Sequence, residues 1–347
     1  MNAPQGTVLD YPFEMQPPPG EAREVAPNIL WLRMPLPFAL EHINIWSLRE
    51  THGFTQIDCG YGDAPTRELW ARHFDTTLHG EPIARIVATH CHPDHLGNAK
   101  WLSDRFGSPV AMTESEYLAA HAIIDQRATH AVTDTCALFR RHGMTDEHFA
   151  ALAARGNQYK RGVPEAPTRF QRLIAGDRFE AGGTTWQVIA GFGHSPEHAA
   201  LYAESMGVLV SGDMLLPKIT TNVAVWPVEP DGDPLARFLD SLTAFETLPL
   251  HTLVLPSHGL PFRGIALRVA QLRAHHAVRL NELAAAVAAA QAPQSAADVI
   301  PVLFRRPLDM QQRFFAMGEA IAHLNHLWHA GRITRLIAGD DAIRFAA

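Results

Sequence analysis

A short stretch of the chain, Thr89 to His95, places three histidines and one aspartate within six residues. The run before it, 85–89, is apolar and β-branched, which predicts a buried strand, and a helical pattern begins at Leu96. The imidazoles and the carboxylate are therefore predicted on a strand-to-helix turn, where α/β proteins usually bind their ligands. A chain with this feature must bring its metal-binding groups to one edge of a sheet.

The spacing within this stretch predicts positions for two metal ions. His90 and His92 lie two residues apart, so on an extended segment both point to one side and can bind one ion. Cys91 then points the other way, which argues against it as a ligand. Asp94 and His95 follow a proline that fixes the bend, and they can turn towards a second ion.

Four further motifs lie where an apolar strand meets a glycine-containing turn, and they carry Asp58, His194, Asp213 and His258. A physically sensible division assigns three ligands to each metal. The first metal takes His90, His92 and His194, and the second takes Asp94, His95 and His258. Asp213 bridges both metals with its two oxygens. Mixed imidazole and carboxylate ligation favours Zn²⁺, with Fe and Mn as alternatives.

Length and composition define the class of protein that we expect. The 347 residues allow two domains, and the net charge of -7 provides no overall attraction to nucleic acid. No apolar run approaches the roughly 18 residues of a transmembrane helix, and the first residues lack the pattern of a secretory signal. Only three cysteines occur. We therefore expect a cytoplasmic protein without disulfides and without a membrane partner.

The order of apolar runs predicts three parts. Residues 1–24 are rich in proline and are predicted to be an N-terminal tail, and strands alternating with helices at 25–265 indicate a catalytic domain. Within that domain, the alternation of strands and helices is interrupted at 113–173, which is predicted to be a helical insertion over the active site. Its expected elements are helices at 116–141 and 146–155 and a loop at 156–167.

The third part, 266–347, is predicted to be a helical linker and a small C-terminal domain. A long helix is expected at 265–290, followed by helices at 296–304 and 310–330 and two short strands at 333–337 and 342–345. Two helices followed by a two-stranded wing are typical of a winged-helix-like domain.

The ordered motifs HCHPDH at 90–95, GHSPEH at 193–198, SGD at 211–213 and PSHG at 256–259 resemble those of metallo-β-lactamase-fold hydrolases. The resemblance covers about 25–265. It implies an α/β fold, an αββα sandwich with two metals at one edge of its sheets, and it implies that Asp58 orients a ligating histidine. The C-terminal part resembles the winged-helix appendage of a glyoxalase II-like subgroup that includes lactamase-like protein 2. Glu197 departs from the family pattern, in which glycine often follows Ser-Pro.

Family members with a bridging aspartate include thioesterases, lactonases and nucleases, whereas true β-lactamases typically lack it. We therefore predict a hydrolase in which a metal-bridging hydroxide attacks the carbonyl of a small-molecule thioester, ester or lactone. Asp94 and Asp213 are the predicted catalytic residues, and Asp94 would hold the hydroxide and move its proton. Phe192 and Trp226 could enclose an acyl group, although a core or loop anchor is the preferred interpretation of Trp226.

The main alternative is a metal-dependent ribonuclease or phosphodiesterase that holds nucleic acid on the winged helix. The segment from 295 onwards carries six arginines and five acids, a net charge of only +1, which is poor for binding phosphate. We therefore expect no nucleic-acid partner and assign the winged helix to packing or to a homodimer interface. A DNA-binding regulator with an inactive enzyme domain is disfavoured by the complete ligand set. A one-iron oxygenase is disfavoured because the second set of ligands is present.

Overall fold

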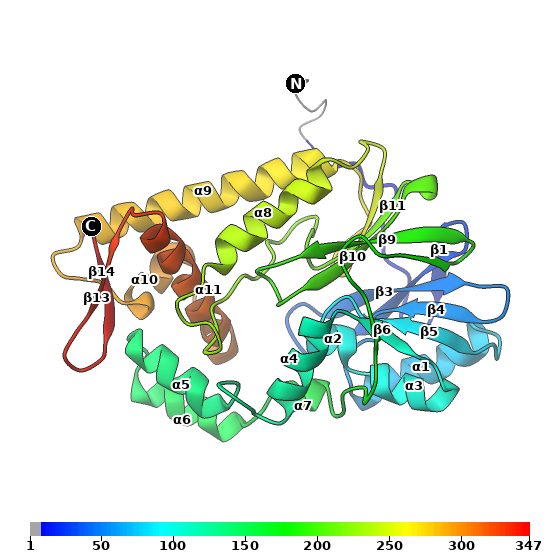
Figure 1. The fold of residues 1–347 in the computed structure, drawn as a ribbon, viewed down its shortest axis with the longest axis horizontal. Helices are drawn as coiled ribbons and strands as arrows, with labels where there is room; N and C mark the ends of the chain where they lie inside the picture. The colour runs from blue at the N-terminus through cyan, green and yellow to red at the C-terminus, as the bar shows by residue number, and fades with distance from the viewer. Residues whose placement is uncertain (1–7) are drawn as a thin grey trace. The chain divides into compact units, whose positions relative to one another are not determined.

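The structure, a computed structural model, describes residues 8–347 and divides into two units (Figure 1). The first unit contains the described residues up to Ile124, together with Gln158–Thr221 and Ser241–Val269. The second unit contains Asp125–Asn157, Asn222–Asp240 and Ala270–Ala347. Strands and helices alternate through the first unit, which confirms the predicted mixed α/β class.

A seven-stranded sheet forms one half of the first unit. Its strands, in spatial order, are β1 (Ala22–Ala26), β2 (Ile29–Pro35), β3 (His42–Arg49), β4 (Phe54–Ile57), β5 (Ile83–Val87), β6 (Val110–Met112) and β7 (Gln171–Arg172). Strands β1 to β4 pair antiparallel, whereas β4 to β7 pair parallel. The parallel strands are connected through α1 (Ala64–Thr76), α2 (Pro93–Leu96) and α3 (Ala99–Phe106). Their carboxyl ends therefore meet at one edge of the sheet.

A five-stranded sheet forms the other half. Its order is β12 (Leu253–Pro256), β11 (Val208–Gly212), β10 (His198–Ala203), β9 (Thr184–Gly191) and β8 (Arg178–Ala181). Strands β10 and β11 pair antiparallel and are joined by a short 3₁₀ turn at Glu204–Met206. Strand β12 pairs parallel with β11, so the residues after both strands lie at the same edge.

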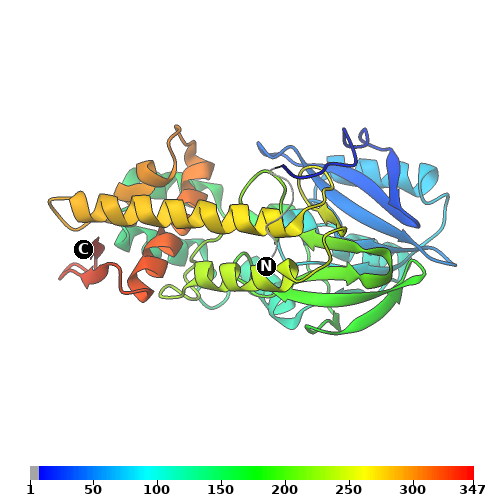
Figure 2. The same ribbon diagram turned by 90° about the horizontal axis from the view of Figure 1, so that it is seen from above.

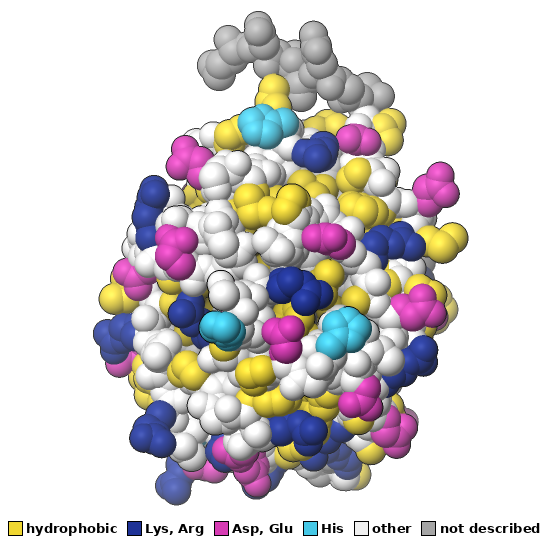
Figure 3. Space-filling view, turned by 90° about the vertical axis from the view of Figure 1, so that its right-hand side faces the viewer, with side chains coloured by type: hydrophobic (Ala, Val, Ile, Leu, Met, Phe, Trp, Pro, Cys, Tyr) yellow, Lys and Arg dark blue, Asp and Glu magenta, His cyan; other side chains and the backbone are white. Residues whose placement is uncertain are grey.

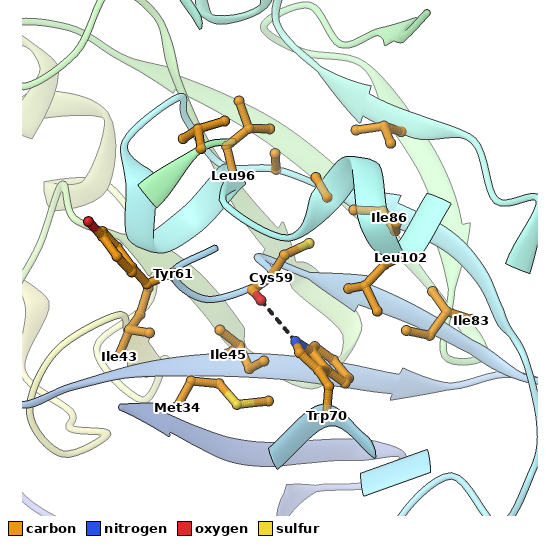
Figure 4. Close-up of a cluster of buried hydrophobic side chains, with 14 of the residues drawn as sticks. Met34, Ile43, Ile45, Cys59, Tyr61, Trp70, Ile83, Ile86, Leu96 and Leu102 are labelled. Atoms are coloured by element: carbon orange, nitrogen blue, oxygen red, sulfur yellow. Dashed lines mark hydrogen bonds between the residues drawn. The ribbon is translucent and has the colours of Figure 1, made fainter. Parts of the chain in front are cut away.

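Alternating side chains of the first sheet enter two different apolar clusters. Ile29 and Trp31 of β2 pack with side chains of the second sheet, whereas Leu32 and Met34 pack with side chains of α1 and α3. This period of two is expected for a strand buried on both faces. In the helix-side cluster, Nε1 of Trp70 donates to the carbonyl of Cys59, 2.9 Å away (Figure 4). The first sheet is thus covered by helices on one face and by the second sheet on the other.

The segment predicted as an insertion differs from its expected helices. The single helix predicted at 116–141 is wrong, because α4 (Glu114–Ile124) and α5 (Val132–Arg141) are separate. Between them Gln126 and Ala128 have φ angles of 52° and 50°, which a continuous helix cannot contain. Helix α6 (Asp146–Arg155) agrees with its prediction, and the predicted loop contains the short helix α7 (Tyr159–Gly162). The predicted role of this segment as an active-site cover stays a prediction.

Helices form most of the second unit. They include much of the long α9 (Ile265–Ala289), visible along its whole length in Figure 2, and also α10 (Ala296–Leu303) and α11 (Met310–His329). Capping boxes at Ser295 and Asp309 begin α10 and α11. An antiparallel pair, β13 (Thr334–Ile337) and β14 (Ile343–Ala346), follows them. These elements agree with the predicted order of two helices and two strands. Across residues 8–347, none of the helices combines the length and apolarity needed to cross a bilayer.

Candidate metal centre

Seven side chains come together at the edge of the two sheets in two groups, within each of which one ligand atom per residue lies within 4.8 Å of the others. The first group is His90, His92, His194 and Asp213, and the second is Asp94, His95 and His258. These are the seven residues that the sequence predicted as metal ligands. That they bind metal stays a prediction, but their predicted division into two sets agrees with the geometry.

Asp213 lies between the two groups. Its Oδ2 atom is 3.4 Å from Nε2 of His194, in the first group. Its Oδ1 atom is 3.5 Å from Nε2 of His258 and 3.6 Å from Nε2 of His95, in the second group. Each carboxylate oxygen therefore faces one set of imidazoles, as a bridging ligand requires.

Each member of the two groups follows the end of a strand. The stretch from His90 to His95 follows β5, and His194 lies in the turn between β9 and β10. Asp213 directly follows β11, and His258 lies two residues beyond β12. Both sheets thus contribute ligands, because the parallel pairs β4–β5 and β11–β12 end at the shared edge.

The donor set fits a pair of divalent cations. Nε2 of His95 and Oδ1 of Asp213 are buried without a hydrogen-bond partner, a costly arrangement that metal ligation would relieve. The Nε2 atoms of His90 and His194 lie 3.3 Å apart and face each other. Three imidazoles and a carboxylate around one point suit Zn²⁺, and they also suit Fe or Mn.

Asp58 supports the second group through its contact with His95. Its Oδ2 atom is 2.7 Å from Nδ1 of His95, and its Oδ1 atom accepts a hydrogen bond from the backbone N–H of Thr89 at 2.8 Å. The Asp58 side chain is buried, as is that of His95. It therefore lies where it can orient His95, in the role that the resemblance implied.

His258 is held by the first sheet. Its Nδ1 atom donates to the carbonyl of His42 at 2.9 Å. Asn44 secures the surrounding turn, because it donates to the carbonyls of Ser257, Pro256 and Gly259 at 2.7–2.9 Å. The Asn44 oxygen in turn accepts from Nε1 of Trp31 at 2.8 Å.

Burial and neighbouring charges set opposite protonation preferences within the centre. Burial lowers the pKa of His90 well below its usual range, and the surrounding imidazoles add to this effect. Burial also opposes the charge on His258, but Asp213 and Asp94 outweigh it and raise its pKa to about 10. A metal that binds these nitrogens must therefore compete with protons in the second group.

Two buried residues beside the centre were not predicted. His198 is fully buried, and its Nε2 atom accepts from the backbone N–H of Asp213 at 3.2 Å. The motif GHSPEH contained this histidine, so its spacing was an available signal. Glu116 is also fully buried and accepts hydrogen bonds from the segments that carry His90 and His194, although no motif marked it.

The remaining predicted positions have different surroundings. Cys91 lies outside both groups and packs in the helix-side apolar cluster, as expected for a residue that is not a ligand. Phe192 is 40% exposed. Trp226 belongs to the second unit, where its ring lies 5.6 Å from that of Phe314, which favours the interpretation of an anchor.

Comparisons with known proteins agree with this geometry. Residues 42–258 match the Metallo-beta-lactamase superfamily, and residues 280–347 match the Metallo-beta-lactamase-like, C-terminal domain. The chain is similar to the crystal structure of a Beta-lactamase domain protein from Burkholderia ambifaria, with 48% identity, 97% and 98% of the two chains covered and a TM-score of 0.89. A metallo-beta-lactamase family protein from Thermus thermophilus is 27% identical, with 93% and 99% covered and a TM-score of 0.77.

A further relative is the probable metallo-hydrolase YqjP of Bacillus subtilis (strain 168). It is 24% identical over 330 residues, which cover 90% of this chain and 96% of the relative. The superfamily match extends over more than half of the chain and includes every residue of the two ligand groups. The chain therefore belongs to the metallo-β-lactamase superfamily, and it is a metal-dependent hydrolase.

Proposed function

We propose that this enzyme hydrolyses the acyl C–S or C–O bond of a small-molecule thioester, ester or lactone, by attack on its carbonyl carbon, at a centre of two divalent metals. The observation that carries the proposal is the position of Asp213, with one oxygen facing each ligand group. A shared carboxylate between two three-residue sets supports two adjacent metals rather than one. Zn²⁺ is the favoured ion, and Fe and Mn are the alternatives.

The metals would supply Lewis acidity, which lowers the pKa of a shared water and polarises a carbonyl. The protein supplies proton transfer and orientation. Asp94 is partly exposed, and its Oδ2 atom lies 3.4 Å from Nε2 of His258 and 3.7 Å from Nε2 of His95. A carboxylate in this position can accept a proton from the nucleophile and deliver it to the leaving group. Asp213, which lies between the two ligand groups, would keep them at a fixed separation.

The surroundings of the centre support a small acyl substrate. Phe192 lies two residues before His194 and keeps an exposed ring that an acyl chain could contact. Lys218, five residues after Asp213, could meet an anionic substituent. The order of α10, α11, β13 and β14 supports a winged-helix-like appendage of the glyoxalase II-like subgroup.

A nuclease would use the same donor set, but the surface charge gives it little support. Figure 3 shows a face on which basic and acidic side chains are interspersed. In the second unit, arginines pair with acids: Arg305 lies 2.6 Å from Glu282, and Arg335 lies 2.7 Å from Asp231. These pairs reduce the positive charge available to phosphates.

The test combines elemental analysis with a substrate panel of p-nitrophenyl esters, acyl-CoA and glutathione thioesters, lactones and bis-p-nitrophenyl phosphate. We expect two metals per chain and turnover of carbonyl substrates. Turnover of the phosphodiester alone would replace the proposal with the nuclease. One iron per chain with no hydrolysis would overturn it.

Asp94→Ala tests the proton-transfer role. We expect kcat to fall by about 10²–10⁴ in samples shown to hold both metals. Asp104→Ala is the control, because Asp104 is a 62% exposed acid on α3 that pairs only with Lys100 among the contacts described. Full turnover by a two-metal Asp94→Ala enzyme would refute the role.

A further inference from the structure

Glu116 is a buried carboxylate that belongs to neither ligand group. It lies in the first turn of α4, and its side chain is fully buried. Its Oε2 atom accepts a hydrogen bond from the backbone N–H of Cys91 at 2.8 Å. Its Oε1 atom accepts from Oγ of Ser195 at 2.6 Å and from the backbone N–H of Glu197 at 2.7 Å. Burying a carboxylate is costly unless such donors satisfy it.

The three donors belong to the two segments that carry the first ligand group. Cys91 lies between His90 and His92, and Ser195 directly follows His194. One carboxylate therefore spans the two chain segments that supply all three histidines of this group. A shift of either segment would break a charge-assisted hydrogen bond in a buried environment.

Glu197, where the sequence departs from the family pattern, strengthens the same connection. Its Oε2 atom accepts from Oγ of Ser115 at 2.8 Å, and its carbonyl accepts from Oγ1 of Thr113 at 2.8 Å. The start of α4 and the turn that carries His194 are thus joined by hydrogen bonds of both senses. Glu116 accepts from the turn, and Glu197 accepts from Thr113 and Ser115. A glycine at position 197 could not make the carboxylate contact.

The second ligand group has other supports. His95 is bonded to Asp58, and His258 donates to the carbonyl of His42. Two buried carboxylates, Asp58 and Glu116, therefore support the centre through different contacts, although Asp58 also accepts from the backbone N–H of Thr89, next to His90. Asp58 acts through an imidazole nitrogen, whereas Glu116 acts through the backbone and through Ser195.

We propose that Glu116 is a positioning residue that sets the metal affinity of the three-histidine half and leaves the half with Asp94, His95 and His258 unaffected. The inference rests on the proposed function only in that these side chains must bind metal. The substitution by glutamine tests this role because glutamine has a single acceptor oxygen, so its amide group would face at least one of the three donors.

The test is zinc binding to the metal-free full-length protein, measured by competition with a chromophoric chelator. In Glu116→Gln we expect one of two binding steps to weaken about 10–100-fold, the range for lost support of a ligand. Glu114→Gln is the matched control, because Glu114 lies in the same helical turn but is exposed and pairs with Arg172. We expect Glu114→Gln to leave both steps unchanged.

The His258→Ala background identifies the affected step, because it removes a ligand of the second half only. In the His258→Ala protein, Glu116→Gln should weaken the affinity of the remaining zinc site. Equal weakening of both steps, or a lower melting temperature of the metal-free protein with both affinities unchanged, would overturn the proposal.

If Glu116→Gln does not fold, Ser195→Ala removes one donor and keeps the charge. It should weaken the same step by a smaller factor, and an unchanged step would overturn the proposal. The readout is affinity rather than turnover, so a failure to hydrolyse any ester overturns the proposed function without deciding the role of Glu116.

Discussion

The Nδ1 atom of His95 lies 2.7 Å from Oδ2 of Asp58, and both side chains are buried. The other ring nitrogen, Nε2, faces the carboxylates of Asp94 and Asp213 at 3.7 Å and 3.6 Å. The bond to Asp58 therefore determines which nitrogen of His95 is available to a metal.

Replacing Asp58 by asparagine is predicted to weaken the second half of the centre. The amide keeps the shape of the side chain but lacks the charge that makes His95 a better ligand, so affinity should fall about 10–100-fold at one binding step. Chelator competition measures this change. Asp75→Asn, on an exposed position of α1, is the control. If both variants bind zinc equally well, the orienting role of Asp58 is wrong.

Replacing Gly212 by alanine is predicted to destabilise the first unit. Gly212 has a φ of 53°, and an added Cβ would collide with Nε2 of His198. The unfavourable φ and the overpacking together are expected to cost about 2–4 kcal/mol of unfolding free energy. Gly107→Ala is the control, since Gly107 has a φ of 69° but open space around it. Chemical denaturation measures the free energy of unfolding of both variants, and the difference between them gives the cost of the collision apart from that of the backbone. Equal losses of unfolding free energy in the two variants would contradict the prediction.

Zinc binding at pH 8 is predicted to release at least one proton. Burial disfavours a charged His258, but Asp213 and Asp94 raise its pKa to about 10 in the metal-free protein, against an ordinary value of 6.5. At pH 8 this imidazole is protonated and must lose its proton to bind a metal. Calorimetry in buffers of different ionisation enthalpy measures the number released. A binding enthalpy that does not depend on the buffer would contradict the prediction.

The same shift predicts how the metal-free protein responds to pH. Because the folded pKa of His258 exceeds 6.5, its contribution to stability is complete below pH 6.5 and is lost as the pH rises towards 10. The pKa of Asp94 is lowered from 3.8 because nearby imidazoles outweigh its burial, so its contribution is present above that pH and is lost on acidification. Unfolding free energy measured from pH 6 to 10 should therefore fall, and less so in His258→Ala.

Removing the hydroxyl of Tyr159 is predicted to loosen the connection between α7 and the histidine cluster. Its hydroxyl donates to the carbonyl of Cys91 at 2.6 Å. Tyr159→Phe should cost about 0.5–1.5 kcal/mol of unfolding free energy. Tyr117→Phe, whose hydroxyl bonds to the carbonyl of Thr168 at an exposed position, should cost less. Equal costs would show that burial does not strengthen the Tyr159 bond.

The grouping of the seven candidate ligands was predictable because their chemistry and their spacing both appear in the sequence. His90 and His92 alternate as an extended segment requires, and Asp213 ends an apolar strand. The positions of several strands along the chain followed from the apolar runs. Each of these signals lies within a short stretch of sequence, so none of them depends on contacts between distant residues.

Features that depend on distant partners were not predictable. Glu116 follows a threonine and another acid at a helix start, where acids are common for electrostatic reasons alone. Its three donors lie 25 to 81 residues away in the chain. The break after α4 was missed because Gln126 and Ala128, rather than glycines, adopt positive φ angles.

The seven candidate ligands are spread along the chain from His90 to His258, and the last of them follows β12. During synthesis the first histidines therefore leave the ribosome long before the final one, and the centre is complete only when the second sheet has formed. Binding of metals by both groups would therefore require that these distant segments have already met. A chain stopped before residue 258 would lack His258 and would therefore present only part of the second group.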